Sequence, residues 1–189
     1  MRVSNYIIAL IFFSAFGCDP KNELSSLAEE EILSGVVQDS LFLGLYFGID
    51  KQAFYDHCWK INREGIVTHG TENMSVLYAL KDLNDVDISF NFYPEFLDNK
   101  THKYRATFHY VSWAPWNKEL QSGYLLKVLP AILEGWYGGN KFIKIKDKKG
   151  PHYYKIDGNR QIDLYMKDDR LVVANFTDLK KYPFKLEGL

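Results

Sequence analysis

Three features of the sequence predict an α+β fold, with helices packed on one face of an antiparallel meander sheet. First, the chain of 189 residues contains 13 Tyr, 13 Phe and 4 Trp, a density typical of a β-rich core. Second, several short stretches alternate apolar and polar residues, as half-buried strands do. Third, the elements follow one another in the order helix, strands, helix, strands, which favours separate helical and sheet layers.

The first helix is predicted over Lys51–Glu64. Asp50 is a residue type that caps helix N-termini, and Gly65 is the type that ends helices. Apolar residues recur between them at the spacing of one helix face, namely at Phe54, Cys58 and Ile61. Just before this helix, residues 41–50 are apolar and interrupted by two glycines, so we expect a short strand that leads into a turn.

Strands are predicted after the helix. Residues 74–80 alternate imperfectly, whereas 86–93 and 104–110 alternate cleanly. The segment between the last two runs carries Pro94, Asp98 and Asn99, which favour a turn, so these runs are expected to form a long hairpin.

A second helical segment is predicted from about Lys118 to Tyr137. Pro130 lies inside it and should kink it or divide it in two, and Gly138 and Gly139 should end it. Four strand-like runs then complete a meander, with turns at Asp157–Gly158 and 167–169. The order would also suit two copies of one helix-plus-meander unit, although no residue-level repeat supports a duplication.

The first 17 residues have the pattern of a secretory signal peptide. Arg2 supplies a positive charge, and Tyr6–Phe16 is an apolar core too short to span a bilayer. Ala15 and Gly17 precede Cys18, and charged residues follow at once. This segment resembles the lipobox of bacterial lipoproteins. The resemblance implies that Cys18 becomes the first residue of the mature chain and carries the lipid.

The rest of the chain is expected to divide into a flexible tether at 18–40 and a single globular domain at 41–189. The tether is acidic, with Glu29, Glu30 and Glu31 in a solvated run and a weak helix around Leu24–Leu33. The formal net charge of −1 argues against a nucleic-acid partner.

No metal or cofactor motif is present in the sequence, and none is predicted to bind. Asp56-His57-Cys58 is the nearest approach to a catalytic set, but adjacent helix residues point about 100° apart. Cys58 is therefore expected to be a buried structural thiol, and His109 a solvated strand residue. A hairpin turn accounts for Asp157–Asn159, with Arg160 as a surface residue.

The segment VSWAPWNKEL, residues 111–120, places two tryptophans around a rigid Ala-Pro pair. Tryptophans at such a junction can form a binding platform or can fill the gap between helix and sheet. The candidate binding surface consists of Trp113, Trp116, Asn117 and Lys118, with Trp136 and Tyr137 adjoining.

Two functions are compatible with these observations. The first is a lipid-anchored protein of the bacterial cell envelope, held in the outer rather than the inner membrane. It would bind an envelope protein or a glycan without catalysis, as an assembly accessory or an inhibitor. The alternative is a small envelope hydrolase whose site is assembled from a distant carboxylate and histidine.

Overall fold

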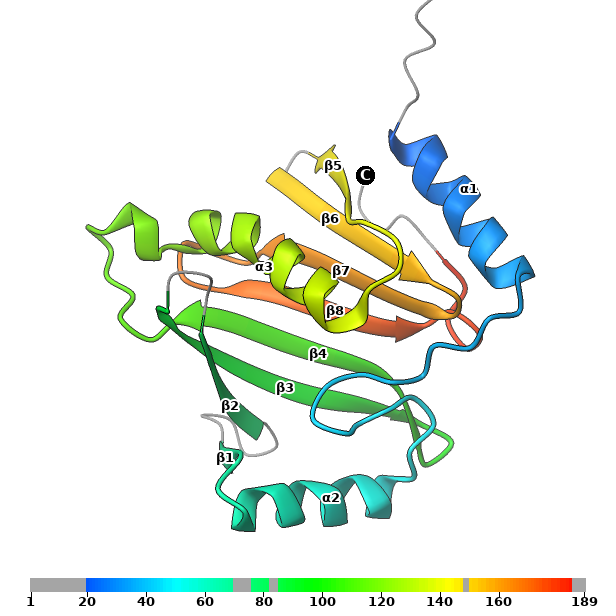
Figure 1. The fold of residues 1–189 in the computed structure, drawn as a ribbon, viewed down its shortest axis with the longest axis horizontal. Helices are drawn as coiled ribbons and strands as arrows, with labels where there is room; N and C mark the ends of the chain where they lie inside the picture. The colour runs from blue at the N-terminus through cyan, green and yellow to red at the C-terminus, as the bar shows by residue number, and fades with distance from the viewer. Residues whose placement is uncertain (1–19, 70–75, 82–84, 148–149, 185–189) are drawn as a thin grey trace, which may run out of the picture.

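A computed structural model describes residues 20–69, 76–81, 85–147 and 150–184, and Cys18 lies outside these ranges. The described chain contains three α-helices, one short 3₁₀ helix and eight strands in one sheet (Figure 1). The helices are α1 (Pro20–Leu33), α2 (Lys51–Arg63), η1 (Lys118–Leu120) and α3 (Ser122–Tyr137). The first four strands are β1 (Thr68–His69), β2 (Val76–Lys81), β3 (Asp87–Leu97) and β4 (Lys100–Tyr110). The last four are β5 (Ile143–Asp147), β6 (Gly150–Asp157), β7 (Arg160–Met166) and β8 (Val172–Asp178). The predicted α+β class is confirmed.

The sheet is built from two antiparallel meanders joined at their last strands. Its spatial order is β1-β2-β3-β4-β8-β7-β6-β5, so β8 pairs with β4 rather than continuing outward. Each meander of four strands is preceded in the chain by one helix, α2 or α3. The arrangement therefore consists of two helix-plus-meander units that meet at the centre of the sheet.

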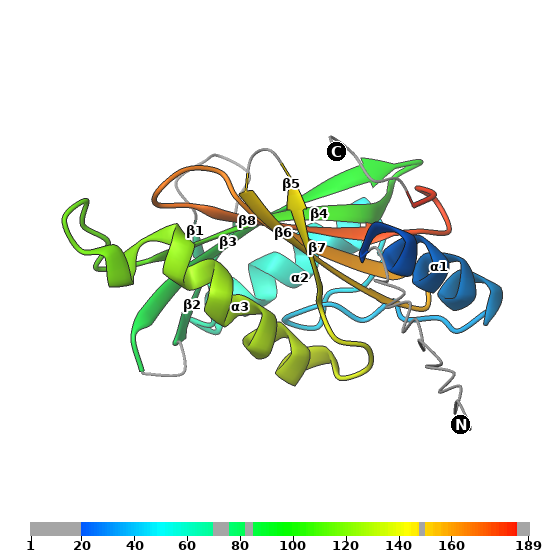
Figure 2. The ribbon, with the colours of Figure 1, turned by 90° about the horizontal axis from the view of Figure 1, so that it is seen from above.

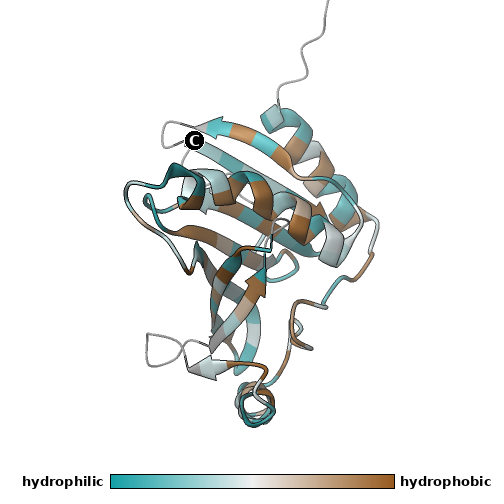
Figure 3. Cartoon of the chain, turned by 60° about the vertical axis from the view of Figure 1, so that its left-hand side comes forward, coloured by the Kyte–Doolittle hydropathy of each residue, from teal (hydrophilic) through white to brown (hydrophobic). Residues whose placement is uncertain are grey.

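Helices α2 and α3 contribute to one core on one face of the sheet. Apolar and polar residues alternate along the strands, as the bands in Figure 3 show, and successive strand residues point to opposite faces of the sheet. This core includes Phe90, Phe108, Leu164 and Phe176 from the sheet, Phe54 and Cys58 from α2, and Leu125, Leu129 and Leu133 from α3. On the other face of the sheet, α1 (Figure 2) packs against β5 and β6.

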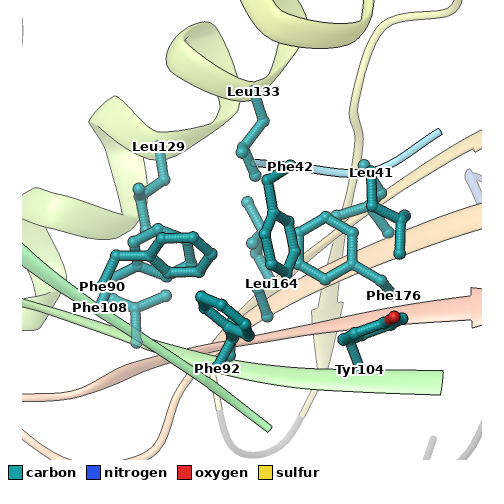
Figure 4. Close-up of a cluster of buried hydrophobic side chains, with 14 of the residues drawn as sticks. Leu41, Phe42, Phe90, Phe92, Tyr104, Phe108, Leu129, Leu133, Leu164 and Phe176 are labelled. Atoms are coloured by element: carbon teal, nitrogen blue, oxygen red, sulfur yellow. The ribbon is translucent and has the colours of Figure 1, made fainter. Parts of the chain in front are cut away.

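Residues 34–50 are not a strand, contrary to the expectation for 41–50. They form an irregular loop that makes isolated bridges at Ser40–Tyr46 and Asp50–Lys100. Phe42 projects from this loop between α3 and the sheet (Figure 4). Its ring meets four aromatic rings edge-on, with centroid distances of 4.9 Å to Phe90 and 4.9 Å to Phe92. The apolar residues that suggested a strand instead fill the core from a loop.

The weak helix expected around Leu24–Leu33 is present as α1, Pro20–Leu33, but it is docked on the sheet and is not part of a flexible tether. Leu24 and Ala28 of this helix are buried against Ile145, Tyr154, Ile156 and Leu179. Tyr154 faces α1 while its neighbour Tyr153 packs against the main core, so α1 lies on the face of the sheet opposite α3. The segment that follows Cys18 is thus part of the folded domain.

Glu31 was expected to be solvated, but it fastens α1 to the sheet. Its carboxylate accepts hydrogen bonds from Asn140 Nδ2, at 2.6 Å, and from the Gly158 backbone N–H, also at 2.6 Å. Gly158 has a φ of +53°, and a Cβ there would collide with the Val36 carbonyl oxygen. Only glycine fits this turn without strain or displacement.

The helix predictions are largely confirmed. Helix α2 ends one residue earlier than predicted, and its Asp50 cap accepts from Gln52 N at 2.9 Å. The second segment is divided at Gln121, between η1 and α3, and not at Pro130, which lies inside α3. Met74, at the start of the imperfect strand, lies outside the described residues.

Replacing Phe42 tests whether this loop supports the core. Phe42→Ala should lower the free energy of unfolding by about 3–5 kcal/mol, because it removes a buried ring and leaves a cavity. Tyr46→Ala is the matched control, since Tyr46 lies in the same loop with 46% of its surface exposed. Urea denaturation measures both variants. Equal losses for the two variants would contradict the assignment.

Candidate functional site

The predicted tryptophan surface is divided between the two ends of α3. Trp113 and Trp116 precede the helix, whereas Trp136 and Tyr137 are in its last turn. The 16 residues of α3 rise about 24 Å in total. The structure therefore does not bring the two pairs together, and the expected adjoining surface is not formed.

Trp116 does not fill the core, because 85% of its surface is exposed. Trp113 is half-buried: its indole N–H donates to the Asp169 carbonyl at 3.3 Å, and the Arg170 guanidinium lies 5.6 Å from its ring. Asn117 caps η1 by accepting from Glu119 N, and Lys118 is exposed beside it. Trp116 and Lys118 are thus both exposed. The interpretation that these residues fill the gap between helix and sheet is wrong for Trp116.

Tyr137, at the other end of α3, is partly buried and packs against the hydrophobic core. Its ring packs 6.3 Å from that of Phe176, and the Arg160 guanidinium lies 4.2 Å from its centroid. Burial raises the pKa of the Tyr137 hydroxyl well above its ordinary value. Trp136 is 40% exposed and contacts Phe90 and Tyr137. Trp136 and Tyr137 therefore pack the end of α3 against the sheet, and we do not assign them to a binding surface.

The Asp56-His57-Cys58 set is separated as helix geometry predicts. His57 Nε2 donates to the Leu43 carbonyl at 2.7 Å and so supports the loop before α2. Cys58 faces the core, and burial raises the pKa of its thiol to about 12. An imidazole directed at Leu43 and a protonated thiol in the core do not form a nucleophile–base pair.

His109 is half-buried rather than solvated. Its Nε2 accepts from the Arg170 guanidinium at 3.1 Å, so the ring is neutral. Burial, and secondarily the charge of Arg170, lowers the pKa of His109. Arg170 therefore contacts both His109 of β4 and Trp113.

The predicted turn around Gly158 is present, but its polar residues are buried. Lys155 is fully buried and donates to the carbonyls of Gly138 and Asn140, with Asp157 Oδ2 at 2.7 Å from its ammonium. Arg160 was expected at the surface, but it is 3% exposed and contacts the same carboxylate at 3.3 Å. A neighbouring buried pair joins His102 to Asp178 at 3.0 Å. This network is enclosed by α1 and the 34–40 loop, so we interpret it as structural.

A large groove lies on the open face of the sheet and was not identified from the sequence. It measures about 740 Å³, crosses β3, β4, β8, β7 and β6, and is bordered by Tyr182 and Pro183 after β8. The ladder pairs Arg105 with Asn175, Asn175 with Asp163, and Asp163 with Tyr154, so these four residues form one row across the face. A parallel row contains Glu95, Lys103, Thr177 and Gln161.

The centre of the groove is a hydrogen-bonded polar cluster around Asp163. Its Oδ2 accepts from Asn175 Nδ2 at 2.9 Å and from His152 Nε2 at 3.3 Å, while Oδ1 accepts from Gln161 Nε2 at 3.2 Å. His152 Nδ1 lies 3.3 Å from the Tyr154 hydroxyl, and the two rings stack at 4.4 Å. Both ring nitrogens of His152 are therefore engaged within the cluster.

One side of the groove is basic. Lys103 Nζ lies 4.1 Å from the centre of the Tyr182 ring, which fixes its position. The Arg105 side chain is exposed, and its guanidinium has no polar partner within the described residues. Because a guanidinium offers five N–H donors, Arg105 is the group in the groove best placed to bind an anion.

No family model, curated protein or solved structure matches this chain. Its function must therefore be inferred from the geometry of its own surfaces. The described residues contain no group of three or more His, Cys, Asp or Glu side chains that could hold a metal ion.

Cys58 provides a direct test of the helix assignment. With a thiol pKa of about 12, roughly one molecule in 10⁴ carries the thiolate at pH 8. Cys58 should resist alkylation by iodoacetamide in the folded protein and become reactive in urea. Peptide mapping measures how much of Cys58 is modified in each case. Labelling of the native protein at the rate of a free cysteine would contradict the buried position.

Proposed function

We propose that this chain is a lipid-anchored, non-enzymatic binding protein of the bacterial cell envelope. Its anchor is the lipid on Cys18, and its ligand site is the groove on the open face of the sheet. The signal-peptide pattern of residues 1–17 supports the first part. In the described chain no helix is both long and apolar enough to cross a membrane.

The observation that carries the binding function is the polar floor of the groove. Amide, carboxylate and hydroxyl groups of Asn175, Gln161, Asp163 and Thr177 lie together on the sheet, beside the exposed Arg105 guanidinium, which is unpaired among the described residues. Side chains fixed by neighbouring strands lose little entropy when a ligand binds. A ligand with an anionic group and several hydrogen-bonding groups would match this surface.

The paired His152 and Asp163 favour the alternative of a hydrolase, because they bring a histidine and a carboxylate together in a groove. A general base, however, needs a ring nitrogen free to accept a proton from water or substrate. His152 Nε2 faces Asp163 and Nδ1 faces the Tyr154 hydroxyl. We therefore assign the pair to positioning Asn175 and Gln161 through Asp163, and not to proton transfer.

Cys18→Ser tests the anchor. The variant should lose labelling by a clickable fatty acid in cells and accumulate as the uncleaved precursor, because serine cannot form the thioether. Cys58→Ser is the matched control and should be labelled like the wild type. Undiminished labelling of the Cys18→Ser protein would refute lipid attachment at this residue.

Arg105→Gln tests the groove. The full-length lipidated protein should retain about tenfold less of its ligand from envelope extract, the equivalent of one charge-assisted hydrogen bond. The melting temperature should be unchanged, because the Arg105 side chain is exposed. Arg63→Gln, an exposed guanidinium on α2, is the control and should bind normally. Unchanged retention by Arg105→Gln would exclude the groove as the site.

His152→Gln separates the two functions. For a binding protein, the ligand retained by the wild type is recovered chemically intact, and this variant changes only the amount retained. For a hydrolase, mass spectrometry would find cleaved ligand with the wild type and intact ligand with His152→Gln. Cleavage that depends on His152 would overturn the non-enzymatic proposal.

A further inference from the structure

A second surface, on the opposite side of the sheet from the groove, is strongly basic. Four exposed lysines gather where the first half of α3 and η1 lie beside β5, namely Lys118, Lys127, Lys144 and Lys146. The first three line one hollow of about 550 Å³, together with Glu119 and Tyr153. Lys146 follows Lys144 by two strand positions and so points to the same face. We call these four lysines the basic surface.

The charges of the basic surface are not neutralised within the described chain. The ammonium groups of Lys118, Lys127 and Lys146 have no carboxylate partner there, and Lys144 lies 5.5 Å from the Tyr153 ring. Glu119 is the one carboxylate that lines the hollow with them. The surface therefore carries net positive charge, although the chain as a whole has a formal charge of −1.

Exposed aromatic and apolar side chains border the basic surface. Trp116 is 85% exposed two residues before Lys118, and Tyr124, 38% exposed, lines the hollow itself. Val111, near the start of the same loop, is 62% exposed. Lysines combined with an exposed Trp and Tyr are the composition found where proteins meet the headgroup region of a bilayer.

The position of α1 places the anchor at the same edge of the sheet as this surface. Pro20, the first described residue, is two residues after Cys18, a separation of at most about 7 Å. Leu24 in the first half of α1 packs in one cluster with Ile145 of the edge strand β5. Ile145 lies between Lys144 and Lys146 and points to the other face of the strand. Figures 1 and 2 both show the start of α1 on the β5 side of the sheet. A lipid on Cys18 would thus enter the membrane close to the strand that carries two of the lysines.

We propose that the basic surface lies on the bilayer in which Cys18 is anchored and contacts anionic lipid headgroups. The inference rests on the proposed lipid anchor. The acyl chains hold the protein on the membrane, and the lysines fix which side of the domain faces it. Because β5 is the edge strand and α1 shares the groove's face of the sheet, this orientation turns the β5 edge toward the bilayer.

The experiment uses the full-length lipidated protein in vesicles with brominated acyl chains, which quench nearby tryptophans. One vesicle is phosphatidylcholine alone, and the other contains about 30% phosphatidylglycerol to supply negative charge. Subtracting the signal of Trp116→Phe isolates Trp116. Trp59→Phe is the control, since Trp59 is 59% exposed on α2. We expect Trp116 to be quenched at least twice as strongly in the anionic vesicles.

The lysines are tested in the same assay. The double variant Lys127→Gln with Lys144→Gln should reduce the quenching of Trp116 to the level seen in phosphatidylcholine. The matched double variant Lys60→Gln with Arg63→Gln removes two exposed charges from α2 and should have no effect. Raising the salt concentration should mimic the first variant, because screening weakens headgroup attraction.

Vesicle flotation separates this inference from the anchor. Protein that floats with the vesicles but shows equal Trp116 quenching in both lipid mixtures would overturn the basic-surface inference and leave the anchor intact. Wild-type protein that does not float would overturn both proposals. Quenching that is unaffected by the Lys127 and Lys144 substitutions would likewise exclude the lysines as headgroup ligands.

Discussion

The antiparallel pairing of β4 with β8 is the constraint on which both surfaces of this protein depend. It joins the two meanders, whose strands line the groove together, through residue pairs from Lys103–Thr177 to Phe108–Val172. Its register also decides which residues face the helices. A slip of one residue would turn Phe176 toward solvent and bury Asn175 in the core. Exposing an apolar side chain and burying a polar one would both cost free energy. The register of β4 and β8 is therefore fixed, and the set of side chains that line the groove is fixed with it.

The two faces of the sheet consequently have separate chemistry. On one face, the rings from β3, β4 and β8 pack beneath α3, and the basic surface lies where η1 and the first half of that helix meet β5. On the other face, the alternate residues of the same strands form the hydrogen-bonded groove around Asp163. Any change in strand pairing would alter both surfaces together. This division leaves the two proposed contacts, with a membrane and with a ligand, on separate surfaces of one domain.

Local signals predicted much of the fold. The Asp50 cap and the apolar spacing of α2 act within a few residues, and the alternation in β3 and β4 needs no knowledge of their partners. The groove could not be predicted in this way, although Asp163 visibly lies on a polar strand face. Its partner Asn175 comes from β8, and no local pattern places β8 between β4 and β7. Phe42 was misassigned because an apolar run in a loop and one in a strand have the same local pattern.

The misassigned tether has a similar cause, since α1 is held by a distant part of the chain. The Glu31 carboxylate binds the backbone N–H of Gly158, which is 127 positions later in the sequence. Helix α1 can therefore dock only after β6 has been made and paired. During synthesis, the residues of α1 are therefore without their binding site until most of the chain has been made. Any factor that binds the residues of α1 during synthesis thus meets them before they dock, and the completed fold buries Leu24 and Ala28 afterwards.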